Sequence, residues 1–328
     1  MSRSSVLTPE EREHFINHGW IKIPGAFTKE QAETITGNVW TRLGMSPTDK
    51  STWTRLRTNM PSHSNFDASQ FAPRAWAAIC ELCGGEDRVA SWSKMWKDSL
   101  IVNLGTALGE GRPVPPHKLD GWHCDGDFFV HFLDSPEQGL LVIPLFTDII
   151  PEGGGTVICP DAIPKVAQHL YDHPEGVSPR MTPRGGTDFK QEQNLNWFNG
   201  VAKSCSTFVE ATGKAGDVYL LHPLMLHSAA SNAMRNVRII TNPPVALNKP
   251  FCFDREDGDY SPVELATLKA LGRDRLEGWK ITSPRERVVP ERIRIQERMK
   301  MEELQRLEEE KRKKGSSQES SSQVSAAA

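Results

Sequence analysis

The sequence predicts a mainly β core with flanking helices, and two observations support this fold class. Between residues 99 and 247, short apolar segments alternate with Gly, Pro, Asn and Asp, which is typical of strands joined by turns. Helical patterns precede this region and follow it. The chain of 328 residues is long enough to bury a large core. We therefore expect an all-β sandwich or barrel with helices packed against it.

Composition excludes several classes of protein. The 39 basic and 42 acidic residues give a net charge of -3, which provides no electrostatic footprint for nucleic acid or an anionic membrane. The start lacks the apolar core of a secretory signal, and no later segment has the ~18 uninterrupted apolar residues of a membrane span. Six cysteines are too sparse for a disulfide framework. We expect a soluble, cytoplasmic protein without nucleic-acid or membrane partners.

Helices with a short strand between them are expected in the first third of the chain. "LTPEEREHFINHG" begins with Thr8 as N-cap and ends at Gly19, and "FTKEQAETITGNVWTRLG" repeats this pattern. "FAPRAWAAICELCGG" is a further helix that follows a proline and ends at paired glycines. "WIKIPGAF", between the first two helices, is β-like. These elements are expected to be scaffold.

The core strands are expected from about residue 99 to residue 247. The helix "AIPKVAQHLYDHP" interrupts them, and the polar stretch 175–199 is expected to form an inserted loop. The strand-like segments are "SLIVNLG", "GWHCDGDFFVHF", "GLLVIPLFTDI", "GGTVICP", "CSTFVEATG", "GDVYLLHP", "LMLHSAAS" and "RIITNPPVAL".

Helical patterns return after the strands. "SPVELATLKALG" belongs to the single domain that we assign to residues 1–284. Residues 285–314 are highly charged with a thin apolar stripe, which predicts a solvated or partner-seeking helix. Residues 315–328 are Ser-rich with almost nothing to bury, and we expect them to be disordered.

A histidine and an aspartate lie two residues apart in "DGWHCDGDFFVHF". In a strand, His123 and Asp125 project from the same face, and Cys124 projects from the other. Burying an unpaired carboxylate is expensive, so this pair needs a salt bridge, a set of hydrogen bonds or a metal ion. Asp127 is in phase with Asp125, but the HxD spacing favours Asp125.

A second histidine-bearing segment follows about a hundred residues later, in "GDVYLLHPLMLHSAASNAMRNVRII". Two histidines and one carboxylate on adjacent strands form the facial triad that binds Fe(II) and leaves positions open. Those positions suit dioxygen and a bidentate 2-oxo acid, whose far carboxylate would need an arginine. His222 and His227 both lie in this segment and compete as the distal ligand, and Arg238 lies eleven residues after His227.

Other residues in these segments have ordinary structural explanations. A single histidine on a strand is more often a core or rim residue than a ligand. This interpretation is favoured for His222, His131 and His117, and Arg235 is interpreted as a surface charge.

These motifs together resemble the phytanoyl-CoA dioxygenase-like family of Fe(II)/2-oxoglutarate oxygenases. The resemblance covers roughly residues 7–244 and depends on "WHCD", "PEGGGTVICP", "GDVYLLHPLMLH" and the spaced arginine, in that order. It implies a double-stranded β-helix, also called a jelly roll. "GGGT" and "CPDA" depart from the family's usual "NG-x-L" and "PGSH", which belong to the co-substrate pocket.

The resemblance also implies roles for individual residues. His123, Asp125 and His227 would be catalytic iron ligands, and Arg238 would bind the 2-oxoglutarate carboxylate. Asn103 and Thr156 are further co-substrate candidates.

The function implied is oxidation of a small molecule by O2, with release of succinate and CO2; hydroxylation, desaturation and cyclisation stay open. Two alternatives remain: a cupin-like metal enzyme that does not use 2-oxoglutarate, and a non-catalytic β sandwich that binds a partner. An acidic substrate is one explanation for basic loop residues, and solvated loop charge is an equal one. These residues are Arg55, Arg57, Arg112 and Lys118. The sequence does not indicate an oligomeric state.

Overall fold

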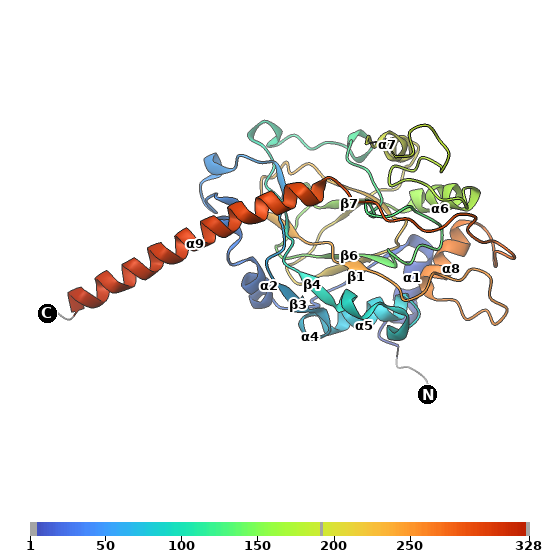
Figure 1. Ribbon diagram of the computed structural model, residues 1–328, viewed down its shortest axis with the longest axis horizontal. Coiled ribbons are helices and arrows are strands. Elements are labelled where there is room, and N and C mark those ends of the chain that lie inside the picture. Colours follow the sequence, from blue (N-terminus) through green and yellow to red (C-terminus); the bar gives the residue numbers. More distant parts are fainter. Residues whose placement is uncertain (1–4, 191–192, 326–328) are drawn as a thin grey trace.

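The computed structural model describes residues 5–190 and 193–325 and consists of antiparallel sheets with helices around them (Figure 1). Every strand pair among the described residues is antiparallel. No helix in these residues has the length and apolar character needed to cross a membrane. The helices are α1 (Pro9–His18), α2 (Lys29–Thr36), α3 (Val39–Leu43), α4 (Ala68–Phe71), α5 (Pro73–Leu82), α6 (Ile163–Asp172), α7 (Asn196–Lys203), α8 (Pro262–Ala270) and α9 (Arg292–Ser325).

The strands begin and end close to the apolar segments of the sequence. They are β1 (Trp20–Ile23), β2 (Arg57–Asn59), β3 (Asn65–Asp67), β4 (Met95–Lys97), β5 (Ile101–Asn103), β6 (Leu140–Pro144), β7 (Thr156–Cys159), β8 (Val209–Ala211), β9 (Val218–Leu221), β10 (Leu226–Ala229), β11 (Arg238–Ile240) and β12 (Pro244–Val245).

Two sheets share the core strands, and the chain passes repeatedly between them. One sheet has the order β1-β9-β6-β12 and the other has the order β10-β7-β8. The chain therefore goes from β6 to the second sheet for β7 and β8, returns for β9, and crosses again for β10. A third sheet, β11-β5-β2, continues from the first through a bridge between Leu145 and Ile240.

The N-terminal helices form where their capping residues predict. Thr8 caps α1 in a capping box with Glu11, and Gly19 ends the helix at a φ of 72°. The second expected helix is divided into α2 and α3 at Gly37 and Asn38. Helices α1 and α6 both contact α8, so these elements cover one end of the core.

The segment that carries His123 is not a strand, contrary to the prediction. Between Gly121 and Phe132 the chain makes only isolated bridges, one of which joins His123 to His227 on β10. Gly126 interrupts the extended conformation with a φ of 120°, and a Cβ there would lie 2.6 Å from the rings of Phe129 and His131. The bridge still places this segment beside the edge of the second sheet.

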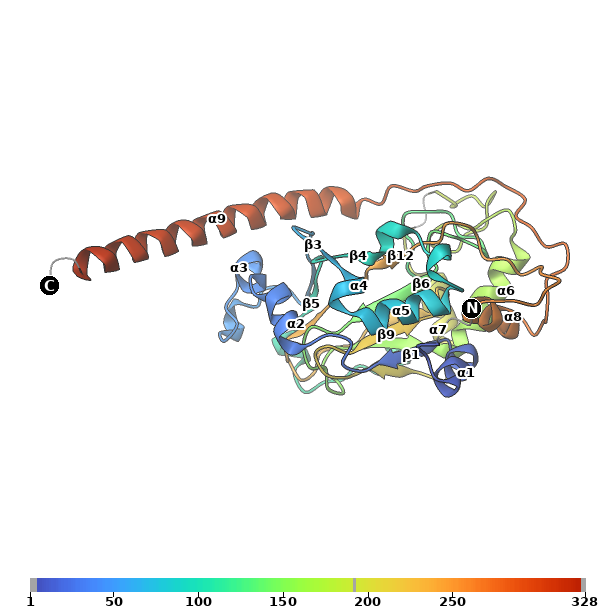
Figure 2. The same cartoon turned by 90° about the horizontal axis from the view of Figure 1, so that it is seen from below.

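The C-terminal charged helix docks on its own chain through a buried glutamate. Glu303 of α9 is only 1% exposed and accepts a 2.8 Å hydrogen bond from Nε of Arg42, which is itself buried. The Nε2 atom of His63 lies 2.8 Å from the same carboxylate oxygen, and Arg42 also pairs with Asp98 at 3.1 Å. Figure 2 shows α3, which carries Arg42, below α9.

The bounds of this helix also differ from the expected ones. We expected a helix over 285–314 and disorder from 315, whereas α9 begins at Arg292 and extends to Ser325, beyond the body of the molecule (Figure 1). No proline follows Pro290, and one internal glycine costs a helix only about 1 kcal/mol, so nothing in the sequence stops it at Gly315. Residues 326–328 lie outside the described part of the chain.

Candidate functional site

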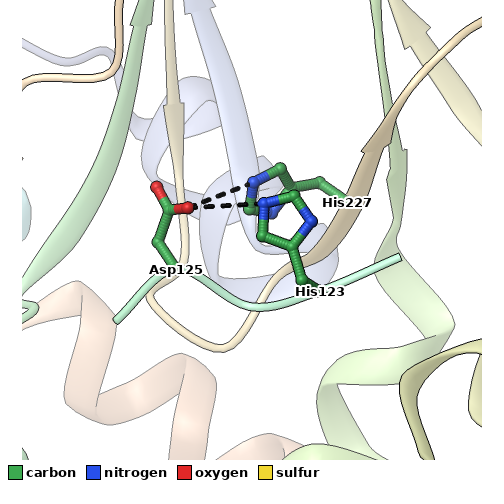
Figure 3. A group of neighbouring side chains, drawn as sticks. All are labelled: His123, Asp125 and His227. Carbon is green, nitrogen blue, oxygen red and sulfur yellow. Dashed lines mark ion pairs between the residues drawn. The ribbon is translucent and has the colours of Figure 1, made fainter. Parts of the chain in front are cut away.

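His123, Asp125 and His227 meet at the edge of the second sheet (Figure 3). The two histidines exchange backbone hydrogen bonds, each of 3.0 Å, and paired residues of an antiparallel ladder project from the same face. Their rings lie 4.3 Å apart, and Nε2 of each lies 3.6 Å from Oδ1 of Asp125. The three potential ligand atoms all lie within 4.8 Å of one another. This set of nitrogen and oxygen donors could hold a divalent metal ion.

Backbone carbonyl groups fix the proton on each ring. Nδ1 of His123 lies 2.8 Å from the Gly121 carbonyl oxygen, and Nδ1 of His227 lies 3.0 Å from that of Met225. A carbonyl oxygen only accepts, so each Nδ1 carries a proton and each Nε2 faces Asp125, where it can bind a metal ion when unprotonated or interact with the carboxylate when protonated. Metal-bound histidines are held in this way, with the second nitrogen donating to a protein acceptor.

The pocket stabilises charge on these groups. Burial raises the pKa of Asp125, but the two adjacent imidazoles outweigh it and hold the pKa well below its usual value. Burial lowers the pKa of His227, and Asp125 more than offsets this, so the pKa is raised. Asn242 Nδ2 also donates to Asp125 Oδ2 at 3.2 Å. The carboxylate therefore remains ionised, which metal binding requires.

His222, the competing distal histidine, does not join this group. It is fully buried, its Nε2 lies 2.9 Å from Oγ1 of Thr267, and its Nδ1 accepts from Leu224 N at 3.1 Å. Burial lowers its pKa to about 3. Both ring nitrogens are therefore used by the protein, as expected for a core histidine.

The remaining competitors are also engaged elsewhere. His131 Nε2 lies 2.8 Å from the Gly126 carbonyl oxygen, and burial lowers its pKa to about 4. Asp127 pairs with Arg292 of α9. His117 lines a different pocket. Arg235 is only 8% exposed and stacks over Trp53, so its interpretation as a surface charge was wrong.

Arg238 is a buried cation beside the triad. It is 2% exposed, and its guanidinium donates to the carbonyl oxygens of Gly154 at 2.7 Å and Ile101 at 3.3 Å. Within the described residues no carboxylate pairs with it. Burial, followed by the neighbouring charge of Arg57, lowers its pKa to about 9. An arginine buried without a counter-ion favours an anionic ligand at this position.

Asn103 lies beside Arg238 on the neighbouring strand and holds the backbone around it. It lies opposite Arg238 in one strand pair and opposite Arg57 in the other. Its Nδ2 donates to Gly154 O and Ala230 O, both at 3.2 Å. The cavity lining includes Thr156 but not Asn103.

The glycine run before Thr156 includes Gly154, a position where the structure requires glycine. Its carbonyl oxygen accepts from both Arg238 and Asn103. Its φ is 80°, and a Cβ would lie 2.7 Å from Asn103 Nδ2. Glycine is needed there because the backbone approaches these side chains so closely.

One cavity of about 580 Å³ contains the triad, Thr156 and Arg238 in its walls. Arg57 also lines it, as expected for a substrate-facing residue, but Arg55 and Arg112 do not, and Lys118 lines the other pocket. Sequence reasoning missed the contribution of α9, whose Arg292 and Gln296 form part of the wall. Arg292 is 165 residues from its partner Asp127, and no local pattern predicts a contact at that separation.

No family model and no curated protein matches the sequence. Solved structures that resemble the chain include the non-heme alpha ketoglutarate dependent carbocyclase SnoK from nogalamycin biosynthesis, at 16% identity over 74% of this chain and 84% of that chain, with a TM-score of 0.39. HygX from Streptomyces hygroscopicus, with nickel and 2-oxoglutarate bound, is 14% identical over 74% of this chain and 88% of that chain, with a TM-score of 0.40. EctD from S. alaskensis, with 2-oxoglutarate and 5-hydroxyectoine, is 14% identical over 75% of this chain and 77% of that chain, with a TM-score of 0.40. These TM-scores are below 0.5, so function is argued from this chain's own residues.

Proposed function

We propose that the protein is a non-haem Fe(II)- and 2-oxoglutarate-dependent oxygenase that acts on a small molecule. The observation that supports this most is one cavity whose walls contain both a two-histidine, one-carboxylate group and a buried arginine with no carboxylate partner among the described residues. The first part suits iron, and the second suits the far carboxylate of a 2-oxo acid.

His123, Asp125 and His227 would hold the iron. Their nitrogens and carboxylate fit a facial triad, and the cavity offers space on the open side of it. Bound iron would supply the activation of dioxygen, coupled to the conversion of 2-oxoglutarate to succinate and CO2. The chain's own contribution is to orient both imidazoles through Gly121 and Met225, and to keep Asp125 ionised.

Arg238 would bind the co-substrate carboxylate with a two-point contact, and Thr156 would line the same subsite. Gly154 and Ile101 hold the guanidinium in place, so little ordering is left to occur on binding. Asn103 does not line the cavity, so it would act by positioning Arg238 and Gly154 rather than by direct contact.

The fold that we propose around this site is a jelly roll. Its support is the repeated crossing of the chain between the sheets β1-β9-β6-β12 and β10-β7-β8. Cytoplasmic location, and the single domain ending near residue 284, remain predictions.

Anaerobic addition of Fe(II) and 2-oxoglutarate tests the proposed function. We expect a visible charge-transfer band in wild type, because the co-substrate chelates the iron, and no band in Asp125→Ala. Asp120→Ala, which changes a nearby carboxylate outside the cavity wall, is the matched control and should give the band. Iron binding without any response to 2-oxoglutarate would instead favour a cupin-like metal enzyme that uses no 2-oxo acid.

A further inference from the structure

The cavity contains more positive charge than the proposed reaction needs. Its carboxylates are Asp125 and Asp127. Its cations outnumber them and are Arg57, Lys97, Arg180, Arg238 and Arg292. An iron ion would add two positive charges and 2-oxoglutarate would add two negative ones, so the excess would remain. Such a cavity attracts an anion.

The cations belong to different parts of the fold. Arg57 and Arg238 flank Asn103 on neighbouring strands of one sheet and form the inner group. Arg180 follows α6, in the segment after residue 175, and Arg292 is the first residue of α9. We call Arg180 and Arg292 the outer arginines.

The outer arginines have free hydrogen-bonding capacity. The Arg180 guanidinium forms no hydrogen bond or ion pair with any described residue. Arg292 is held by Asp127 through Nε and Nη2, which leaves the Nη1 side of the fork available. Asp127 thus orients Arg292 without using all its donors, as a pre-organised anion subsite requires.

Both outer arginines lie close to the same groups beside the triad. The charge of Arg180 acts on His131, and so does that of Asp127, the partner of Arg292. Arg180, Asp127 and Arg292 also line the same cavity, so both guanidiniums belong to the wall that contains the triad.

We propose that the substrate is a small oxyanion, a carboxylate or a phosphate ester, whose acidic group binds to Arg180 and Arg292. The inference rests on the proposed function and assigns its substrate class. The acidic group would contact the outer arginines, and the inner group would be left for the co-substrate.

Calorimetric titration with matched pairs of probes tests this inference. The full-length protein, loaded with Fe(II) and 2-oxoglutarate under argon, is titrated with benzoate against benzamide and with phenyl phosphate against phenol. We expect at least one anion to bind about tenfold more tightly than its neutral partner. Arg180→Gln and Arg292→Gln should each weaken that anion about tenfold, with unchanged affinity for 2-oxoglutarate. Arg294→Gln removes an exposed charge of the same helix outside the cavity wall and is the matched control, with wild-type affinity expected.

Three results would overturn the proposal. They are equal binding of the neutral probes, wild-type anion affinity in Arg180→Gln and Arg292→Gln, and no anion binding at millimolar concentration. Titration of the iron-free Arg238→Gln protein without 2-oxoglutarate separates this inference from the proposed function. If wild type does not bind 2-oxoglutarate, the proposed function is contradicted but the anion subsite is not. The anion titration of Arg238→Gln reports on the outer arginines alone.

Discussion

At the scale of single residues, the site depends on which ring nitrogen each histidine leaves free. Gly121 and Met225 accept from Nδ1 of His123 and His227, so both Nε2 atoms face Asp125. His222 is held by Leu224 and Thr267 at both nitrogens, and it has no lone pair left for a metal.

Iron content should distinguish the two distal histidines. We expect His227→Ala to purify with little iron, because a triad that lacks one ligand binds the metal weakly. His222→Ala should retain about one iron per chain even if its stability falls. Iron analysis of both proteins at equal concentration checks this, and the reverse pattern would mean that His222 is the ligand.

Acid should destabilise the fold through His222. Burial lowers the pKa of His222 to about 3, whereas an exposed histidine titrates near 6.5. Between these pH values the unfolded chain binds a proton at His222 and the native state does not. The free energy of unfolding should therefore fall as pH drops from about 6.5 toward about 3, by up to roughly 2 kcal/mol at pH 5 from this residue. Urea unfolding of wild type and His222→Gln at pH 7 and pH 5 measures this, and the variant should lose less stability. Equal losses would show that His222 is not the source.

The grouping of His123, Asp125 and His227 could be predicted from the sequence. The HxD spacing places two of these side chains on one segment, and the segment of His227 brings the third to them. Arg180 and Arg292 could not be predicted in the same way, since their place in the cavity depends on a loop and a helix that join the site through tertiary contacts.

At the scale of elements, helix ends and core strands followed local chemistry, and the exceptions have identifiable causes. Caps such as Thr8 and apolar runs such as "GLLVIP" act within a few residues, so α1 and β6 lie where expected. The HxD segment is irregular because Gly126 leaves the extended conformation. The docking of α9 depends on Glu303, which resembles any other charge in a charged helix until its partner Arg42 is placed.

Removing this anchor should weaken the fold. Breaking a buried ion pair leaves an uncompensated charge, so Glu303→Ala should lower the free energy of unfolding by about 3 kcal/mol. Glu302→Ala, the neighbouring exposed glutamate, should change it by no more than about 0.5 kcal/mol. Urea denaturation compares the two, and equal effects would contradict the docked position of α9.

At the scale of the whole molecule, α9 joins the site to a distant part of the chain. Its first turns carry Arg292 and Gln296 into the cavity wall, and Glu303 fastens it to Arg42 and to His63. The helix is therefore fixed to the rest of the described chain as far as Glu303, and its first turns form part of the cavity wall.

Two truncations should locate the boundary of this body. Deletion from Gly315 onward should leave melting temperature and 2-oxoglutarate binding unchanged, because it keeps the anchor. Deletion from Glu302 onward removes Glu303 and should lower the melting temperature by several degrees. Thermal denaturation of both proteins checks this, and a large fall for the shorter deletion would show that residues beyond 314 contribute to stability.

Steady-state succinate formation by wild type and Arg238 variants tests the central claim most directly. A charge-assisted two-point contact in this pocket contributes roughly 2 to 4 kcal/mol, so Arg238→Ala should raise KM for 2-oxoglutarate by about thirty- to a thousandfold. Arg238→Lys should recover part of the loss, since lysine restores the charge without the planar fork. Iron should remain bound in both variants. An unchanged KM in Arg238→Ala, or product formation without 2-oxoglutarate, would contradict the assignment.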